Sequence, residues 1–221
     1  MQQEFRRDND ILLLSSIRGE MDEQPGTNFI LTGSYAIEAL TRTPVAHNDI
    51  DGNVFSADLV RARSRLLNLG YHIVTDRNNR VEFDVPHPEA DLPVRRVEIG
   101  LVKTINALGD NSSVFYLENA SGDPFIVPTE LAPLVSSKGD EYLFRVKSLS
   151  YAIATWMIRI SGIVSNQKRD VRPSDISHLA LLLERDYKYD DVIMNMKNHP
   201  QMPPNIPANT VFEKALTLVH P

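Results

Sequence analysis

The sequence contains no cysteine among its 221 residues. This absence excludes disulfide bonds, zinc sites with thiolate ligands and cysteine nucleophiles, so any bound metal ion must be held by oxygen or histidine ligands. Long apolar runs are also missing: no stretch approaches the roughly 20 apolar residues that span a bilayer, and the opening segment MQQEFRRDND lacks the apolar core of a signal peptide. We therefore expect a soluble, cytoplasmic protein that does not interact with membranes.

Basic residues are also fewer than acidic ones. The chain has 23 Lys and Arg residues against 29 Asp and Glu residues, which gives a formal net charge of −6. Broad binding to duplex DNA depends on the neutralisation of many phosphates by Lys and Arg, so this composition argues against it. Two local basic clusters, at 61–65 and at 95–96, are typical of a solvated helix face and of a strand edge, although a basic patch there stays open.

The spacing of apolar residues predicts alternating helices and strands in the first part of the chain. The predicted helices cover 12–17, 35–42 and 56–71, and the predicted strands cover 29–32, 48–55, 72–76, 80–85 and 94–102. From about Pro128 the spacing becomes helical, most clearly at 147–164 and 174–186, and a last helix follows the prolines of 200–207. We expect an α+β fold with a small mixed β-sheet core at 1–125 and a helical bundle at 126–221.

Gly33 and Ser34 lie where a predicted strand passes into a helix. Backbone N–H groups at a helix start are unpaired and can bind an anion such as phosphate, and Gly33 lets the backbone approach such a ligand closely. The alternative is an ordinary turn in which Ser34 is the N-cap of the helix.

Asp49 and Asp51 alternate with Ile50 in a predicted strand. Residues two apart in a strand project from the same face, so the two carboxylates lie together and repel each other unless a cation lies between them. Carboxylate oxygens suit Mg²⁺, which prefers carboxylates together with substrate phosphates. The alternative is a solvent-facing acidic strand end.

A third carboxylate on a neighbouring strand would complete a site for two ions. In VRRVEIGLV, Val97 and Ile99 share one face and Glu98 lies on the other. The strand RVEFDV offers Glu82 and Asp84 instead. Glu98 is favoured because its strand is longer and more apolar, and hence more central.

The order of these features resembles that of the DNA polymerase β-like nucleotidyltransferase superfamily. A Gly-Ser pair, a helix, an Asp-x-Asp strand and a later strand carboxylate follow one another from Gly33 to Glu98. The resemblance is closest to the minimal bacterial members, namely the aminoglycoside nucleotidyltransferases and the AbiEii-type toxins of abortive-infection systems. It implies transfer of a nucleoside monophosphate from an NTP to an acceptor hydroxyl, with release of pyrophosphate and with two Mg²⁺ ions, or Mn²⁺, as cofactors.

The resemblance also implies roles for individual residues. Asp49, Asp51 and Glu98 would be the catalytic metal ligands, and Glu98 would accept the acceptor's proton. Gly33 and Ser34 would hold the β- and γ-phosphates. In the helical half, the family has a helix-borne lysine that faces the triphosphate, which points to Lys147. Asp175 matches an acidic position of the family, with His178 where a second acid is more usual.

Several alternatives stay open. Gly52 replaces a large apolar residue of the family pattern, which leaves room for a catalytically degenerate member that binds a nucleotide or a protein as a regulator. A plain interaction module is a third reading. The acidic composition favours a small molecule or a protein over RNA as the acceptor. We expect His47 to be a solvent-exposed turn residue, with the positioning of a phosphate or acceptor as the alternative. We expect Trp156 to be a core residue of its helix, with stacking on a base as the alternative.

Overall fold

The computed structural model describes nine segments of the chain, and all structural statements below concern them: 2–21, 29–47, 49–55, 59–77, 80–85, 95–102, 114–118, 124–162 and 171–220. The helices are α1 (Gln2–Met21), α2 (Gly33–Thr41), α3 (Leu59–Asn68), α4 (Leu149–Ile160), α5 (Pro173–Leu183), α6 (Tyr189–Lys197) and α7 (Ala208–Val219). The strands are β1 (Phe29–Leu31), β2 (Asp49–Phe55), β3 (His72–Arg77), β4 (Arg80–Val85), β5 (Arg95–Val102), β6 (Val114–Glu118), β7 (Pro124–Val135) and β8 (Glu141–Lys147).

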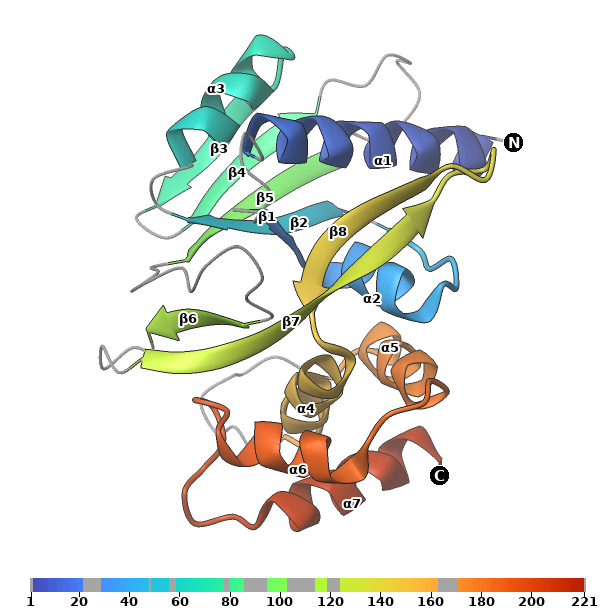
Figure 1. The fold of residues 1–221 in the computed structure, drawn as a ribbon, viewed down its shortest axis with the longest axis vertical. Helices are drawn as coiled ribbons and strands as arrows, with labels where there is room; N and C mark the ends of the chain where they lie inside the picture. Colours follow the sequence, from blue (N-terminus) through green and yellow to red (C-terminus); the bar gives the residue numbers. More distant parts are fainter. Residues whose placement is uncertain are drawn as a thin grey trace.

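The strands form one eight-stranded mixed sheet in the order β3-β4-β5-β2-β1-β8-β7-β6 (Figure 1). The pairs β1/β8 and β2/β5 are parallel, and the other neighbouring pairs are antiparallel. The two strands that carry the sequence motifs, β1 and β2, therefore lie in the middle of the sheet.

Helices α1 and α3 lie side by side across one face of this sheet (Figure 1). Ile11, Leu14 and Ile17 follow one another at three-residue spacing along α1, and all three are fully buried. The two helices are joined by the guanidinium of Arg65, which donates from Nε and Nη2 to the Ser16 hydroxyl over 3.0 and 2.7 Å. The buried residues of α1 belong to the same apolar core as Ile50 and Val54 of β2.

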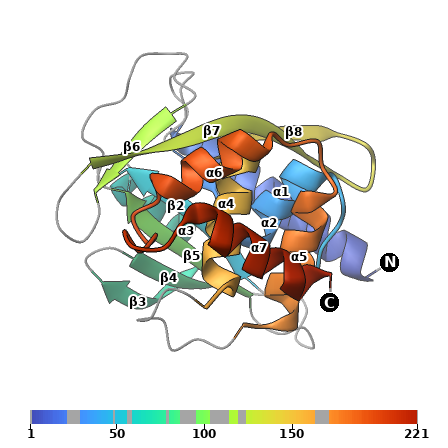
Figure 2. The same ribbon diagram turned by 90° about the horizontal axis from the view of Figure 1, so that it is seen from below.

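The helices α4 to α7 gather on the other side of the sheet, with α4 at the centre (Figures 1 and 2). Helix α4 contacts α5, α6 and α7, and its Ile153 and Met157 are fully buried. Helix α7, which follows the proline-rich segment, joins the same core through Val211 and Ala215. None of the described helices is long and apolar enough to cross a membrane.

The expected α+β fold, with a mixed sheet and packed helices, is confirmed. The structure differs from the expectation at 124–147, where β7 and β8 are strands of the sheet, so that the helices of the second half begin at Leu149 rather than at 126. The alternating pattern was obscured because β7 contains three prolines, Pro124, Pro128 and Pro133. Prolines are tolerated there because residues 124–128 of β7 pair only with β6, and residues 129–135 only with β8, within the described segments.

Candidate active site

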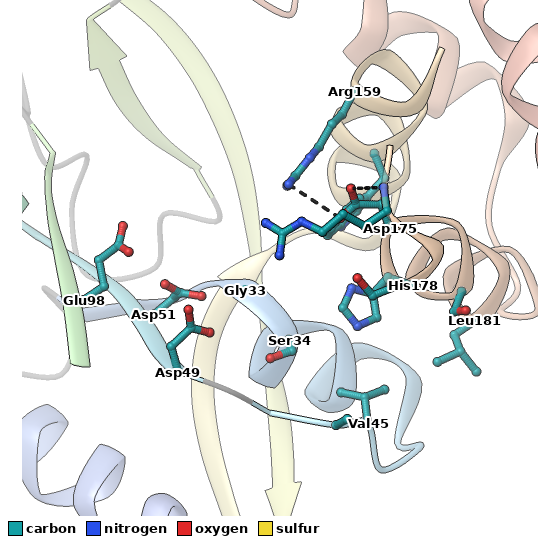
Figure 3. Close-up of a pocket in the computed structure, with 15 residues that line it drawn as sticks. Gly33, Ser34, Val45, Asp49, Asp51, Glu98, Arg159, Asp175, His178 and Leu181 are labelled. Atoms are coloured by element: carbon teal, nitrogen blue, oxygen red, sulfur yellow. Dashed lines mark hydrogen bonds and ion pairs between the residues drawn. The ribbon is translucent and has the colours of Figure 1, made fainter. Parts of the chain in front are cut away.

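A pocket of about 660 Å³ lies where the acidic strands, the start of α2 and the helices α4 and α5 meet (Figure 3). Its lining combines residues from distant parts of the sequence, namely Gly33, Ser34, Val45, Ala46, Asp49, Asp51, Glu98, Trp156, Arg159, Arg172, Ser174, Asp175, Ser177, His178 and Leu181. The two motifs at Gly33–Ser34 and Asp49–Asp51 therefore share one concave surface.

Three carboxylates project into this pocket from one face of the sheet. In β2, Ile50 is buried while Asp49 and Asp51 lie on the opposite face, as strand alternation requires. Asp51 is paired in register with Glu98 on the parallel neighbour β5, so these two side chains lie beside each other on the same face. Glu82, the alternative third carboxylate, lies opposite Glu98 on β4 and is one strand further from Asp51. Glu82 and Asp84 are not among the residues of the pocket lining.

Gly33 is in direct contact with the aspartate motif. Its φ of +64° is in the left-handed region, and a Cβ atom at this position would overlap the carboxylate oxygen Oδ2 of Asp51. The Thr32 N–H donates to the Asp51 carbonyl over 3.0 Å, which ties the end of β1 to β2. A glycine is therefore needed at position 33 for two reasons: its φ angle is positive, and the Asp51 carboxylate leaves no room for a Cβ atom.

Ser34 does not cap α2 as the sequence suggested. The helix begins at Gly33 with Thr32 as its N-cap, and the Thr32 side chain makes no capping hydrogen bond there. The N–H groups of the first turn therefore keep the anion-binding potential of an uncapped helix start. Ser34 lies inside that turn, with its hydroxyl 3.0 Å from Nδ1 of His47.

The expectation that His47 is solvent-exposed is wrong. Only 4% of its side chain is exposed, because the ring stacks on Tyr35 at 3.5 Å between centroids and its Nε2 lies 2.7 Å from Oε2 of Glu38. Glu38 was not predicted as a site residue, although a glutamate in the apolar run YAIEAL of α2 is the signal that would have found it. Burial raises the pKa of Glu38, but hydrogen bonds from His47 and Arg7 and their positive charges bring the pKa below its ordinary value.

The wall of the pocket opposite the carboxylates comes from α4 and α5 (Figure 3). The Arg159 guanidinium lies 4.7 Å from the centroid of the Trp156 ring, and its Nη2 is 3.5 Å from the carboxylate of Asp175. Asp175 in turn accepts a hydrogen bond of 3.1 Å from the backbone N–H of Arg172 at the start of α5. Trp156, which the sequence suggested as a core residue, therefore forms part of the pocket wall.

His178 lies beside this group, with its ring edge-on to Trp156 at 5.4 Å between centroids. Burial lowers its pKa; the negative charge of Asp175 opposes this shift, and the positive charges of His47 and Arg159 add to it. Its Nδ1 atom is buried and has no hydrogen-bond partner among the described residues. The pocket thus combines an acidic floor on the sheet with a helical wall that carries arginine and aromatic groups.

Comparison with solved structures places this architecture among known folds. No protein-family model matches the sequence, and no curated protein matches it. The solution structure of the antibiotic-resistance factor ANT(2'')-Ia matches with a TM-score of 0.55 and 13% identity, over 96% of this chain and 97% of that one. The crystal structure of ANT(2'')-Ia in complex with adenylyl-2''-tobramycin gives the same TM-score and identity, over 85% and 95% of the two chains.

The chain has the nucleotidyltransferase fold. The resemblance that the sequence motifs predict is therefore confirmed at the level of the fold. The lincosamide antibiotic adenylyltransferase LnuA, in its lincomycin-bound crystal structure, also matches, with 16% identity and a TM-score of 0.46 over 70% of this chain and 85% of that one.

Within this nucleotidyltransferase fold, Lys147 does not occupy the position that the sequence suggested. It is the last residue of β8 rather than part of a helix, since α4 begins at Leu149 behind the N-cap Ser148. Its ammonium lies 5.5 Å from the centroid of the Tyr151 ring, where burial lowers its pKa, and Lys147 is not among the residues of the pocket lining. Arg159 of α4 does line the pocket, and the sequence analysis did not single it out.

The carboxylates do not form a ready-made metal centre. Within the described segments, no group of three or more His, Asp or Glu side chains lies close enough together to hold a metal ion. Any ion at this place must therefore complete its ligand shell with oxygen atoms from a bound ligand or after a shift of the side chains.

Proposed function

We propose that the chain is a nucleotidyltransferase, which transfers a nucleoside monophosphate from an NTP to an acceptor hydroxyl and releases pyrophosphate. One observation carries the proposal: the Asp51 carboxylate lies against Gly33, so the acidic face of the sheet and the uncapped start of α2 line the same pocket. A cation site beside a phosphate site is the arrangement that binding a metal–triphosphate complex needs.

The donor atoms of the pocket suit Mg²⁺ or Mn²⁺. We assign Asp49, Asp51 and Glu98 as the ligands of two such ions, because all three offer hard carboxylate oxygens on one face of β2 and β5. A site without a preformed group of three ligands is expected where phosphate oxygens of the NTP complete the shell. When bound, the ions would neutralise phosphate charge and lower the pKa of the acceptor hydroxyl.

The chain's own residues would perform the remaining tasks. The N–H groups at Gly33 and Ser34 bind the β- and γ-phosphates, and Glu98 accepts the proton that leaves the acceptor hydroxyl. Arg159 and Arg172 on the opposite wall offset the charge of the departing pyrophosphate, which is the role that the resemblance suggested for Lys147.

The acceptor is proposed to be a small hydroxylated molecule or a protein side chain rather than RNA. The chain is acidic overall, with a formal net charge of −6, which disfavours broad binding to a polyanion. ANT(2'')-Ia, whose fold this chain shares, was solved with adenylyl-2''-tobramycin, a modified small molecule.

A second candidate function keeps the fold without the reaction. The absence of a preformed three-ligand group from the described residues fits this reading as well as the catalytic one: the chain would be a degenerate nucleotidyltransferase that binds nucleotide or a partner protein as a regulator. The glycine at position 52, where the family pattern has a large apolar residue, does not support a degenerate site. A Cβ atom at Gly52 would overlap the ring of Phe29 on the core side of the sheet. Gly52 is therefore explained by packing and not by decay of the acidic site.

The deciding experiment uses the four NTPs, each labelled at the α-phosphate, with Mg²⁺ and a panel of aminoglycosides, lincosamides, proteins and tRNA. We expect label transfer and pyrophosphate release by the wild type, and a loss on the order of 10²–10³-fold in Asp51→Asn, because an uncharged amide cannot balance the charge that develops on the phosphates. Asp186→Asn, an exposed site away from the pocket, is the matched control.

Equal turnover by Asp51→Asn and wild type would refute the assignment of the metal site. Calorimetric binding of an NTP without product for any acceptor of the panel would instead favour the degenerate alternative.

A further inference from the structure

A chain of four polar side chains runs from α1 to the pocket. Arg7 on α1 donates from Nε to Oε1 of Glu38 over 2.7 Å. Oε2 of Glu38 lies 2.7 Å from Nε2 of His47, and Nδ1 of His47 lies 3.0 Å from Oγ of Ser34. Ser34 lines the pocket, whereas the other three residues lie behind it. The chain therefore ends on a hydroxyl group that a ligand in the pocket can reach.

The His47 ring is held from several sides. It lies parallel to the Tyr35 ring, with an interplanar angle of 3°, and the Tyr35 hydroxyl donates to the buried carboxylate of Asp10 on α1. Oε2 of Glu38 also accepts the backbone N–H of Val45 over 3.3 Å, two residues before His47. Rotation of the ring would break its stacking on Tyr35 and its hydrogen bonds with Glu38 and Ser34.

These contacts also fix which ring nitrogen faces Ser34. A carboxylate only accepts hydrogen bonds, so Nε2 of His47 carries the proton that is shared with Glu38, and Nδ1 is directed to the Ser34 hydroxyl. A serine side chain otherwise rotates among its staggered conformers. The contact with Nδ1 restrains the position of Oγ, and this restraint is the same for the neutral and the charged ring.

We propose that His47 is a positioning residue for nucleotide binding: it holds the Ser34 hydroxyl at the wall of the pocket where the triphosphate binds, and Glu38 and Arg7 hold His47. This inference rests on the proposed function, because it presupposes an NTP at this pocket. Helix α1, none of whose described residues lines the pocket, then contributes to NTP affinity through Arg7.

Two substitutions at His47 separate its two hydrogen bonds. In His47→Asn the side-chain amide reaches about as far as Nδ1, so it keeps a partner for Ser34 and loses Glu38. In His47→Gln the amide reaches about as far as Nε2, so it keeps a partner for Glu38 and loses Ser34. We expect His47→Gln to raise the Kd of the Mg²⁺–NTP complex about tenfold, and His47→Asn to raise it clearly less. His220→Gln, at an exposed site, is the control.

A double-mutant cycle with Ser34→Ala tests whether His47 acts through Ser34. The Kd is measured by calorimetry with the NTP that stabilises the wild type most. In the Ser34→Ala background, His47→Gln should produce no further change in Kd. The same weakening of Kd by His47→Gln in both backgrounds would overturn the proposal, since a merely structural role of His47 does not depend on the Ser34 hydroxyl.

A second readout needs no nucleotide. The ¹⁵N chemical shifts of the His47 ring in the free protein should show a protonated Nε2, and Ser34→Ala should move the Nδ1 shift while Nε2 stays in place. An unchanged Nδ1 shift would refute the contact with Ser34. If no NTP binds to the wild type at all, the proposed function fails, and the NMR result still shows whether the chain from Arg7 to Ser34 exists.

Discussion

Gly33 and Gly162 have nearly the same backbone angle in very different surroundings. Their φ angles are +64° and +65°, but a Cβ atom would overlap the Asp51 carboxylate at Gly33, whereas at Gly162 it would meet no atom of the described residues within 4 Å. At the scale of single residues, substitution of these two glycines distinguishes two effects. An alanine at Gly162 strains only the backbone, whereas an alanine at Gly33 also collides with the Asp51 carboxylate.

We predict that Gly162→Ala lowers the free energy of unfolding by about 1 kcal/mol and leaves NTP binding intact, because only the backbone is strained. Gly33→Ala should cost more stability and should also abolish binding of Mg²⁺–NTP, since the Asp51 carboxylate must move away. Urea unfolding and calorimetry measure the two quantities. Normal NTP affinity in Gly33→Ala would show that the contact between Gly33 and Asp51 is irrelevant to the site.

At the scale of elements, the junction of α4 with the end of α6 contains a buried histidine. His199 Nδ1 accepts the backbone N–H of Gln201 over 3.2 Å, and its Nε2 lies 3.5 Å from the Thr155 hydroxyl on α4. Burial, and then the positive charge of Lys147, lower the pKa of His199 to about 4. The packing of these helices therefore depends on a neutral imidazole.

This arrangement predicts acid sensitivity. An unfolded chain takes up the His199 proton near pH 6.5, whereas the folded protein does so only near pH 4. Between these values the unfolded state binds more protons, so the free energy of unfolding falls as the pH falls, by up to about 3 kcal/mol from this group.

His199→Asn should lower the free energy of unfolding at pH 7, and this free energy should change less with pH between 6.5 and 4 than in the wild type. In His220→Asn it should change with pH as in the wild type. Denaturant titrations at several pH values measure this. An acid slope in His199→Asn as steep as that of the wild type would contradict the assignment to His199.

At the scale of the whole molecule, the pocket joins the sheet to the helices of the second half. Its floor comes from β2 and β5 and its opposite wall from α4 and α5, so a ligand that contacts both must link them. A ligand that binds only the folded chain raises the free energy of unfolding, by about 2.7 kcal/mol at a hundredfold excess over its Kd. The melting temperature rises with it.

We therefore predict that Mg²⁺ with the preferred NTP raises the melting temperature by roughly 5–10 °C at such an excess. Arg159→Gln should remove most of this shift, because Arg159 is the basic residue of α4 in the pocket wall. Arg185→Gln, an exposed arginine that does not line the pocket, should keep it. Thermal shift measurements with each of the four NTPs test this, and a full shift in Arg159→Gln would exclude Arg159 from the triphosphate site.

The sequence by itself predicted the helices and strands from α2 to β5 to within a few residues, but it indicated only residues 12–17 of α1, which spans Gln2–Met21. It also placed Gly33 and Ser34 after β1, and Asp49 and Asp51 in β2. Strand alternation and helical spacing are local properties, so Asp49 and Asp51 could be assigned to one face of their strand, and Glu98 to the face opposite Val97 and Ile99 on its own strand, without any knowledge of the fold. That Glu98 rather than Glu82 lies next to Asp51 needed the strand order, because the sequence does not say which strands become neighbours.

Only the tertiary structure decided the rest. The strand β7 was concealed by its prolines, since their tolerance depends on which partner strand pairs with each half. Arg159 instead of Lys147 reaches the pocket because of the way α4 packs on its neighbours. The hydrogen bonds that join Glu38 to Arg7 and to His47 span 31 and 9 residues. Contacts of this kind depend on the arrangement of whole elements in space, and local sequence spacing contains no record of it.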